Sequence, residues 1–569
     1  MLNKYVKDFV LEKNGESKDL IVLFHAYTSS PEKLNSVKEV CKSNDRYKNA
    51  DILMPRIPSG VFSIANPVEI TSEILNKVDA IWDSNGQYSS IILIGHSFGA
   101  LLARKLYVYA CGENQGVPFE IADNKPRIWT SKVERIILLA GMNRGWSISY
   151  HMSLLNAVIF TIGSFIGDLI VLTSPFVPLI FRIKKGSSFI TNLRIQWLAM
   201  RNEDNIKAKG TGDALTIQLL GSIDDIVSPE DNLDLVTGRD FFYIDAPNSG
   251  HANIIEMDST KAGESRKKAF TEALTMDAKK IKRIHPSDQQ FPEPQKEVTD
   301  IIFVMHGIRD LGYWTNKIAR KVKRLSFDDD KKVFATETSS YGYFPMLSFL
   351  LPAKRREKVE WFMDKYTESK AVYPNADFSF VGHSNGTYLL AKALTEYPCC
   401  KFKNIVLAGS VVPTTYTWNE LIKKGQVKSV MNYVATSDWV VALFPKAIQI
   451  LNIQDLGSAG HDGFDDLDHP NEIEYVRGAH SAALKEEHWD DIAEFIVNGK
   501  VPDKTFQKKE RSSWLVWLGH ISPLVWLAII SLVIFIGSLI VNQPEWAEWF
   551  KTTVFIGYVW FLYKILTRF

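Results

Sequence analysis

Two serines of this chain stand in the same pattern, Gly-x-Ser-x-Gly, within "SSIILIGHSFGALLARKL" and "DFSFVGHSNGTYLLAKAL". Ser97 and Ser384 each follow an apolar run and precede a segment with the apolar spacing of a helix. A serine at such a strand–turn–helix corner exposes its hydroxyl above the sheet, and the N–H of the next residue points toward any oxyanion formed there. The pattern therefore predicts a nucleophilic serine in each half of the chain, and two occurrences are stronger than one.

An acidic residue and a histidine follow each serine, and each is expected at the end of a strand. In the first half they are Asp224, in "TIQLLGSIDDIVS", and His251, in "FFYIDAPNSGHA". In the second half they are Asp438, in "VMNYVATSDWVVA", and His480, in "EIEYVRGAHSA". The histidine would accept the serine proton, and the carboxylate would orient the imidazole and stabilise its charged form. His488 competes with His480, but "LKEEHWDDIAEFIVNG" has helical apolar spacing, which favours a place on a helix face.

The elements that must position these residues also recur. The apolar run "LIVLFHAYTSS" returns as "IIFVMHGIRD", and strands alternate with helices such as Glu69–Asn85 and Lys354–Lys370. We expect an α/β protein with two tandem domains, each a mostly parallel sheet with helices on both faces. The polar, proline-rich stretch 285–300 is the predicted linker between a first domain at 1–284 and a second at 301–503.

With these motifs the chain resembles the α/β-hydrolase superfamily, especially its serine esterases and lipases, over residues 18–280 and 298–500. The resemblance implies two α/β-hydrolase domains in tandem. It favours Asp224 over Asp225 as the first acid, because "GSIDDIV" matches the acidic turn of that family.

The resemblance also implies an oxyanion hole of backbone N–H groups in each domain. In the first domain these belong to Tyr27 and Phe98, and in the second to Ile308 and Asn385. The second domain is the closer match, because "MHGIRD" has the His-Gly pair of the family, whereas "FHAYTSS" has Ala26 in place of the glycine.

The first domain carries an apolar insertion, at about residues 150–210, before its acidic turn. Its segment "MSLLNAVIFTIGSFIGDLIVLTSPFVPLIF" has Asp168 as its only charged residue. A membrane span, a buried helical cap and an amphiphilic lid are all compatible with this composition. Its glycines and prolines argue against one long span, so we expect two short lid helices with an apolar face toward acyl chains or the bilayer.

The C-terminal region, residues 512–569, is the predicted membrane anchor. Ile521–Val541 is uncharged and long enough to cross about 30 Å of hydrocarbon as a helix, and Val554–Leu566 is a second apolar stretch. We therefore expect a transmembrane helical hairpin; a buried apolar hairpin is the alternative. Basic residues flank the spans and acidic residues lie between them, so the positive-inside rule places the domains on the cytoplasmic side. The N-terminal region lacks the apolar segment of a signal peptide and is predicted to form two strands with a turn at Asn14-Gly15.

Composition excludes several other classes of function. The net charge is +1, from 66 basic and 65 acidic residues. The protein therefore has no strong positive electrostatic field that would favour nucleic acid as a partner. Four cysteines without CxxC spacing fit a reducing compartment. The cluster "HDGFDDLDHP" at 461–470 matches no compact ligand set, and its Gly, Asp and Pro content is typical of a loop. No phosphate-binding loop, dinucleotide fingerprint or zinc pattern is present, so neither a metal nor a cofactor is expected.

Together these features predict a membrane-anchored serine hydrolase that cleaves carboxylic esters, of lipids or of other apolar acyl compounds, through an acyl-serine. Thioester and amide substrates remain open, as does the oligomeric state. The alternative is a membrane-tethered interaction or regulatory protein in which one or both hydrolase folds are non-catalytic.

Overall fold

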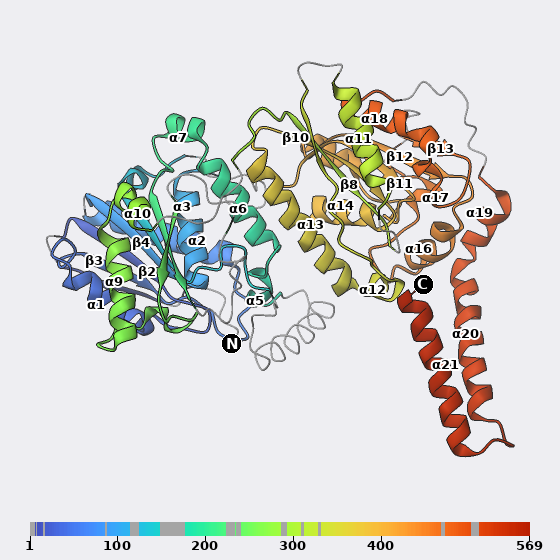
Figure 1. Ribbon diagram of the computed structural model, residues 1–569, viewed down its shortest axis with the longest axis horizontal. Helices are drawn as coiled ribbons and strands as arrows, with labels where there is room; N and C mark the ends of the chain where they lie inside the picture. Colours follow the sequence, from blue (N-terminus) through green and yellow to red (C-terminus); the bar gives the residue numbers. More distant parts are fainter. Residues whose placement is uncertain are drawn as a thin grey trace. The chain divides into compact units, whose positions relative to one another are not determined.

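The computed structural model describes residues 6, 8–14, 17–85, 88–113, 125–147, 177–222, 234, 241–285, 293–308, 312–327, 332–467, 473–501 and 511–568. These residues form two compact units. The first comprises Met1–Glu293 together with Met363–Ala371, and the second comprises Pro294–Phe362 and Val372–Phe569. Each contains a mostly or fully parallel sheet with helices, so the expected α/β class is confirmed (Figure 1).

The first unit contains a seven-stranded sheet with the order β1-β3-β2-β4-β5-β6-β7. Only β1 runs antiparallel to its neighbour, β3; the other neighbouring strands are parallel. The N-terminal region does form two strands, but β3 lies between them, so they make no hairpin. The strands are β1 (Phe9–Glu12), β2 (Asp19–Phe24), β3 (Asp51–Pro55), β4 (Ser90–His96), β5 (Val133–Leu139), β6 (Leu215–Gly221) and β7 (Phe241–Ala246).

Helices cover both faces of this sheet because successive residues of a strand point to opposite sides. On β2, Leu20, Val22 and Phe24 pack with α2 (Pro67–Asn85), α3 and α6, whereas Ile21 and Leu23 pack with α1 and α9. These strands therefore consist of nearly continuous apolar residues, as buried parallel strands do. The remaining helices named here are α1 (Asn35–Ser43), α3 (Phe98–Ala110), α6 (Ser188–Met200), α9 (Lys261–Thr275) and α10 (Ala278–Ile284).

The second unit contains a six-stranded parallel sheet with the order β13-β12-β11-β10-β8-β9. On β8, Ile302 and Val304 pack with α11 and α18, whereas Phe303 contacts Phe362 of α13 on the other face. The strands are β8 (Asp300–Met305), β9 (Phe334–Glu337), β10 (Asp377–His383), β11 (Phe402–Ala408), β12 (Val427–Ala435) and β13 (Ile473–Val476). The main helices are α11 (Thr315–Ser326), α12 (Met346–Leu350), α13 (Pro352–Val372), α14 (Asn385–Glu396), α16 (Trp439–Leu451), α17 (Ala459–Asp462) and α18 (Trp489–Asn498).

The insertion of the first domain is described only in its second half. Residues 148–176, which hold most of the expected lid, lie outside the described residues. The remainder forms α5 (Leu179–Arg182), α6 and α7 (Glu203–Lys209). Helix α6 is buried against α3, and the ring of Trp197 lies 6.5 Å from that of Tyr107. Helix α6 and Leu179 of α5 therefore belong to the hydrophobic core rather than to an exposed lid, whereas α7 has no buried residue.

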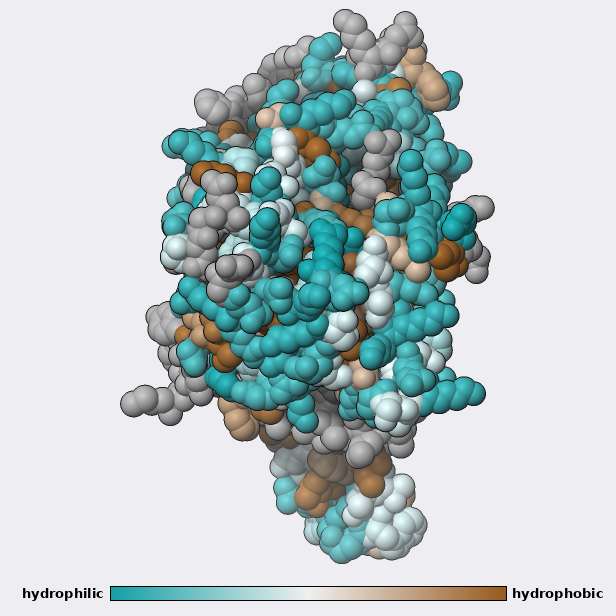
Figure 2. Space-filling model, turned by 90° about the vertical axis from the view of Figure 1, so that its left-hand side faces the viewer, coloured by the Kyte–Doolittle hydropathy of each residue, from teal (hydrophilic) through white to brown (hydrophobic). Residues whose placement is uncertain are grey.

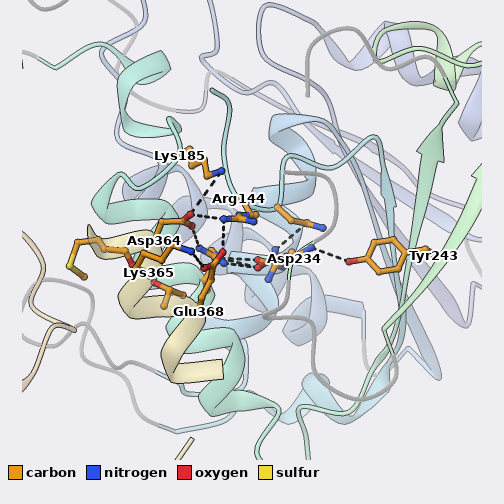
Figure 3. Close-up of polar contacts among 12 residues, drawn as sticks. Arg144, Lys185, Asp234, Tyr243, Asp364, Lys365 and Glu368 are labelled. Atoms are coloured by element: carbon orange, nitrogen blue, oxygen red, sulfur yellow. Dashed lines mark hydrogen bonds and ion pairs between the residues drawn. The ribbon is translucent and has the colours of Figure 1, made fainter. Parts of the chain in front are cut away.

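A buried ion cluster ties the second half of α13 to the first unit (Figure 3). Arg194 Nη2 lies 2.7 Å from Asp234 Oδ1, and Arg194 Nη1 lies 2.7 Å from Asp364 Oδ1. Arg144 binds Asp364 and Glu368. Burial alone would raise the pKa of Asp364, but the two arginines beside it lower that pKa to about 2. The carboxyl group of Asp364 therefore remains charged at neutral pH.

The C-terminal region forms α19 (Ser513–His520), α20 (Ser522–Val541) and α21 (Glu548–Arg568). Among the described residues, α20 is the one helix long and apolar enough to cross a membrane, with a mean hydropathy of 2.9 and 6 % of its apolar window buried. Helix α21 lies along α20, where Tyr558 Oη donates to the carbonyl of Val533 over 2.7 Å (Figure 1). The face shown in Figure 2 is largely hydrophilic, with hydrophobic residues scattered over it.

Candidate active site

Both serines lie at a sharp corner between a strand and a helix. Ser97 joins β4 to α3 with φ of 54°, and Ser384 joins β10 to α14 with φ of 52°. A positive φ is strained for a residue with a side chain and persists only where the surroundings hold it. Here the Ser97 N–H donates to Leu139 O over 2.9 Å, and the Ser384 N–H donates to Ala408 O over 3.0 Å. The same strained backbone thus occurs at both predicted nucleophiles.

Glycines next to the serines let backbone segments approach closely. A Cβ added at Gly99 would lie 2.2 Å from Phe24 O, and one at Gly386 would lie 2.6 Å from Met305 O. A Cβ at Gly307 would lie 2.7 Å from the Cβ of Ser384. Gly307 belongs to the His-Gly pair singled out in the sequence, so its backbone passes directly beside the second serine. A larger residue at any of these positions would force the corner apart.

In the first unit, the structure brings Ser97 and His251 together. His251 Nε2 lies 2.7 Å from Ser97 Oγ, and both side chains are buried. With the ring proton on Nδ1, Nε2 accepts a hydrogen bond from the serine hydroxyl, as a general base does. The predicted acid, Asp224, lies outside the described residues.

In the second unit, the structure brings His480 and Asp438 together. His480 Nδ1 lies 2.9 Å from Asp438 Oδ2, and Asp438 is fully buried. The other carboxylate oxygen, Oδ1, accepts the N–H of Val441 over 3.0 Å and so caps α16. Across the described part of this unit, no hydrogen bond joins Ser384 to His480. Such contacts are often made only when a substrate is bound.

Two positioning residues were not predicted from the sequence. His96 and His383, the residues immediately before the two serines, each direct Nε2 at the backbone carbonyl of the histidine across the site. The distances are 2.8 Å from His96 Nε2 to His251 O and 3.4 Å from His383 Nε2 to His480 O. The sequence did offer one signal for them, because a histidine precedes the serine in both Gly-x-Ser-x-Gly motifs.

Two of the predicted oxyanion-hole residues, Phe98 and Asn385, directly follow the serines in the chain. Phe98 and Asn385 are the first residues of α3 and α14, where backbone N–H groups have no intrahelical acceptor. Ile308 follows Gly307, and Tyr27 follows Ala26 after β2. The N-terminal ends of the two helices therefore offer partial positive charge at each serine.

One histidine directly follows β2 and another directly follows β8, and each organises the loop that comes next. His25 Nδ1 donates to Ala26 O over 2.9 Å, since its Nε2 accepts the N–H of Ile57. His306 pairs in the same way, through Nδ1 with Gly307 O at 2.9 Å and through Nε2 with Ser340 Oγ at 2.7 Å. These histidines are structural in both units.

Tyr341 is a further residue at the second site that the sequence did not indicate. Its hydroxyl donates to His306 O over 2.7 Å and accepts from Asn385 Nδ2 over 3.1 Å. It therefore links the loop after β9 to the residue next to Ser384. No local motif marks this tyrosine.

His488, the rival of His480 as the second base, does not lie where His480 lies. It ends a short 3₁₀ turn before α18, and its ring centre lies 6.0 Å from that of Tyr433, whereas the ring of His480 lies 4.7 Å from that of His383. In the cluster at 461–470, Asp462 pairs with Lys446 and Arg511. Within the described ranges, no group of three or more potential metal ligands occurs.

Comparisons with known proteins give likenesses of fold. No protein-family model matches the chain, and no curated protein matches its sequence. A soluble variant of monoglyceride lipase from Saccharomyces cerevisiae is 13 % identical, with a TM-score of 0.30, covering 47 % of this chain and 92 % of that chain. A lipase from Bacillus licheniformis is 14 % identical, with a TM-score of 0.31, and the match covers 47 % of this chain and 98 % of the lipase. A monoacylglycerol lipase from Paleococcus ferrophilus is 15 % identical, with a TM-score of 0.27, covering 47 % and 98 %.

These three solved structures are lipases, and the chain is similar to them in fold. At these identities and TM-scores the likeness says nothing about activity, which has to be inferred from the serine sites themselves.

Proposed function

We propose that this chain is a membrane-anchored serine hydrolase that cleaves carboxylic esters at Ser97 and Ser384 through acyl-serine intermediates. The observation that carries the proposal is the 2.7 Å contact between Ser97 Oγ and His251 Nε2 at a strained strand–helix corner. A neutral imidazole at that distance accepts the serine proton while Oγ attacks an ester carbonyl carbon.

The remaining steps use groups beside the serine. The carbonyl oxygen becomes negative as the Oγ–C bond forms, and the N–H groups of Phe98 and Tyr27, or of Asn385 and Ile308, would donate to it. The C–O bond to the alcohol then breaks, and the alcohol takes the proton from the imidazolium. Water then takes the place of the alcohol: its oxygen attacks the acyl carbon while its proton passes to the histidine. The C–Oγ bond breaks, Oγ takes the proton back from the imidazolium, and the acid is released.

The acids complete the proposed triads. Asp438 holds Nδ1 of His480, which leaves Nε2 to face Ser384 and stabilises the imidazolium formed during the reaction. Asp224 is proposed for the same role beside His251. The duplicated elbow supports two active domains in tandem. The apolar composition of residues 152–181 supports the proposal that the part of the insertion before α5 forms a lid on the first domain.

The anchor proposal is supported by α20 and by the helix packed along it. The apolar α20 is mostly exposed, which is unfavourable in water and favourable in hydrocarbon. Basic residues precede α20 and end α21, so both ends of the proposed hairpin and both domains would face the cytoplasm.

The test is covalent labelling with a fluorophosphonate, comparing wild type with Ser97→Ala, Ser384→Ala and the double variant. Ser90→Ala and Ser379→Ala are the matched controls, because these buried serines lie on the same strands, β4 and β10. Each single variant should lose one labelled serine, the double variant should lose both, and the controls should lose none. Full labelling of the double variant would show that the nucleophiles are wrong. Unlabelled wild-type protein without ester hydrolysis would favour the non-catalytic alternative.

A further inference from the structure

The second site and the base of the α20–α21 pair are built from the same elements. Helix α16 begins directly after Asp438, which caps it, and the same helix packs against α19 and α20. Trp526 of α20 donates its indole N–H to Leu443 O over 3.2 Å, and its ring centre lies 5.4 Å from that of Phe444. The helix that carries the proposed catalytic acid is therefore seated on the long apolar helix.

A second connection runs through the loop after β9. Tyr341, which binds Asn385 beside Ser384, lies 6.0 Å from Phe344 between ring centres. The chain then enters α12, where the ring of Phe349 lies 6.4 Å from that of Phe444. Helix α12 also packs against α21. Both sides of the second site thus lead to the base of the helix pair (Figure 1).

Large apolar side chains are exposed on these same elements. Hydrogen bonds join the segments that carry them: Ser512 N–H donates to Thr436 O over 3.1 Å, and Gln454 Nε2 donates to Leu350 O over 3.3 Å. We name this surface the collar. Its members are Leu351 (47 % exposed), Trp439 (56 %), Ile450 (49 %), Leu451 (53 %), Ile453 (64 %), Trp514 (65 %) and Trp517 (64 %).

The collar fits a lipid surface better than water. Soluble proteins rarely gather large exposed apolar side chains on neighbouring segments, and α19, which carries two of the collar residues, leads directly into the apolar α20. Tryptophan is enriched where a membrane protein meets the headgroup region, and three of the seven collar residues are tryptophans. An amphiphilic surface that lies in the interface buries such side chains beside a transmembrane helix.

We propose that the collar lies in the membrane interface, so that the Ser384 site takes amphiphilic esters directly from the bilayer. The part that concerns substrate rests on the hydrolase function proposed above; the part that concerns the collar does not. An ester whose acyl chain stays in the hydrocarbon would reach Ser384 along α12 and α16 without crossing water. The substrate class is then an ester lipid of the same membrane rather than a dissolved ester.

The position of the collar is tested by spin labels in the full-length protein, reconstituted in phosphatidylcholine vesicles. Leu451→Cys places a label on the collar, and Phe327→Cys is the matched control. Phe327 is 73 % exposed and follows α11, near the residues that begin β8 and β9. The four native cysteines are buried, so the introduced thiol is the one that reacts.

Collisions with oxygen and with a water-soluble nickel complex report the surroundings of each label. The collar label should meet oxygen and be shielded from nickel, whereas the control label should meet nickel. A collar label as open to nickel as the control overturns the proposal. Shielding from both reagents together with spin–spin broadening also overturns it, because a second copy of the chain would then cover the collar.

The substrate part is tested in Ser97→Ala protein, where only the second site is active. Leu451→Glu should lower hydrolysis of a long-chain ester embedded in the vesicles about tenfold, because a carboxylate is costly in the interface. Hydrolysis of a dissolved short-chain ester should not change, and Phe327→Glu should alter neither rate. Equal effects of Leu451→Glu on both esters would overturn lateral uptake. If Ser384 neither labels nor hydrolyses the dissolved ester, the proposed function fails at this site, and the spin labels still decide where the collar lies.

Discussion

The imidazole of His251 lies 2.7 Å from the hydroxyl of Ser97, although 154 residues of chain separate them. In the second unit the corresponding histidine, His480, makes its short contact to an acid instead, at 2.9 Å from Asp438. One unit thus presents the contact between the proposed base and the proposed nucleophile, and the other presents the contact between the proposed base and the proposed acid. If both units share one arrangement, the two contacts together describe it.

The identity of the second base can be tested against its rival. His480→Ala is expected to lower acylation of Ser384 by about 10³-fold or more, because the serine loses its proton acceptor. His488→Ala is the matched control, since that ring lies beside Tyr433 rather than beside His383. The measurement is the fluorophosphonate labelling rate in Ser97→Ala protein. A slow His488→Ala variant beside a normal His480→Ala variant would reverse the assignment.

Asp438 has two roles that one substitution separates. Asp438→Asn keeps an oxygen that can accept the Val441 N–H, so α16 stays capped and the unfolding midpoint should barely move. The turnover number should nevertheless fall by about 10⁴-fold, because the amide cannot hold the imidazole in the required tautomer. Ester hydrolysis and thermal unfolding are measured on the same Ser97→Ala sample. Unchanged turnover would exclude Asp438 as the acid.

The elbow glycines should be intolerant of even one methyl group. Gly99→Ala is expected to destabilise the first unit by about 3 kcal/mol, since its Cβ would lie 2.2 Å from Phe24 O and the backbone would have to shift. Gly60→Ala is the control, because nothing lies within 4 Å of a Cβ there. Urea unfolding followed by tryptophan fluorescence measures both. Equal midpoints would mean that the corner can relax.

The buried ion cluster should be costly to break. Arg194→Met is expected to cost about 3–5 kcal/mol of unfolding free energy, because Asp234 and Asp364 would remain buried without their shared cation. Arg46→Met is the control: its ion pair with Glu134 is exposed, so solvent screens it and little should change. Chemical denaturation measures the unfolding free energy of both variants.

The same cluster predicts an acid limit of stability. The pKa of Asp364 is lowered from 3.8 to about 2, so its contribution is complete above the unfolded value and is lost as the pH falls through that interval. Asp364→Asn removes the titrating group, so the unfolding free energy should fall less steeply between pH 4 and pH 2 than in wild type. Parallel curves for the two proteins over this interval would contradict the assignment.

The serine corners could be predicted because an elbow is a local feature: glycines, a serine, a preceding strand and a following helix lie within one short segment. Which strands pair with one another was harder to predict from the sequence. Asn14-Gly15 predicted a turn between two strands, and both strands form, yet β1 pairs with β3 rather than with β2. Turn chemistry bends the chain locally but does not select the neighbour of a strand.

By itself, the sequence determined the α/β class, the two serine motifs with their candidate histidines at strand ends, and one helix able to span a membrane. These features depend on residue periodicity and on short motifs. Only the tertiary structure decided that Met363–Ala371 packs with the first unit, that Tyr341 binds Asn385 beside Ser384, and that α16 sits on α20. Such contacts join residues far apart in the chain, and their partners are chosen by packing and by the need to pair buried polar groups, which no local pattern encodes.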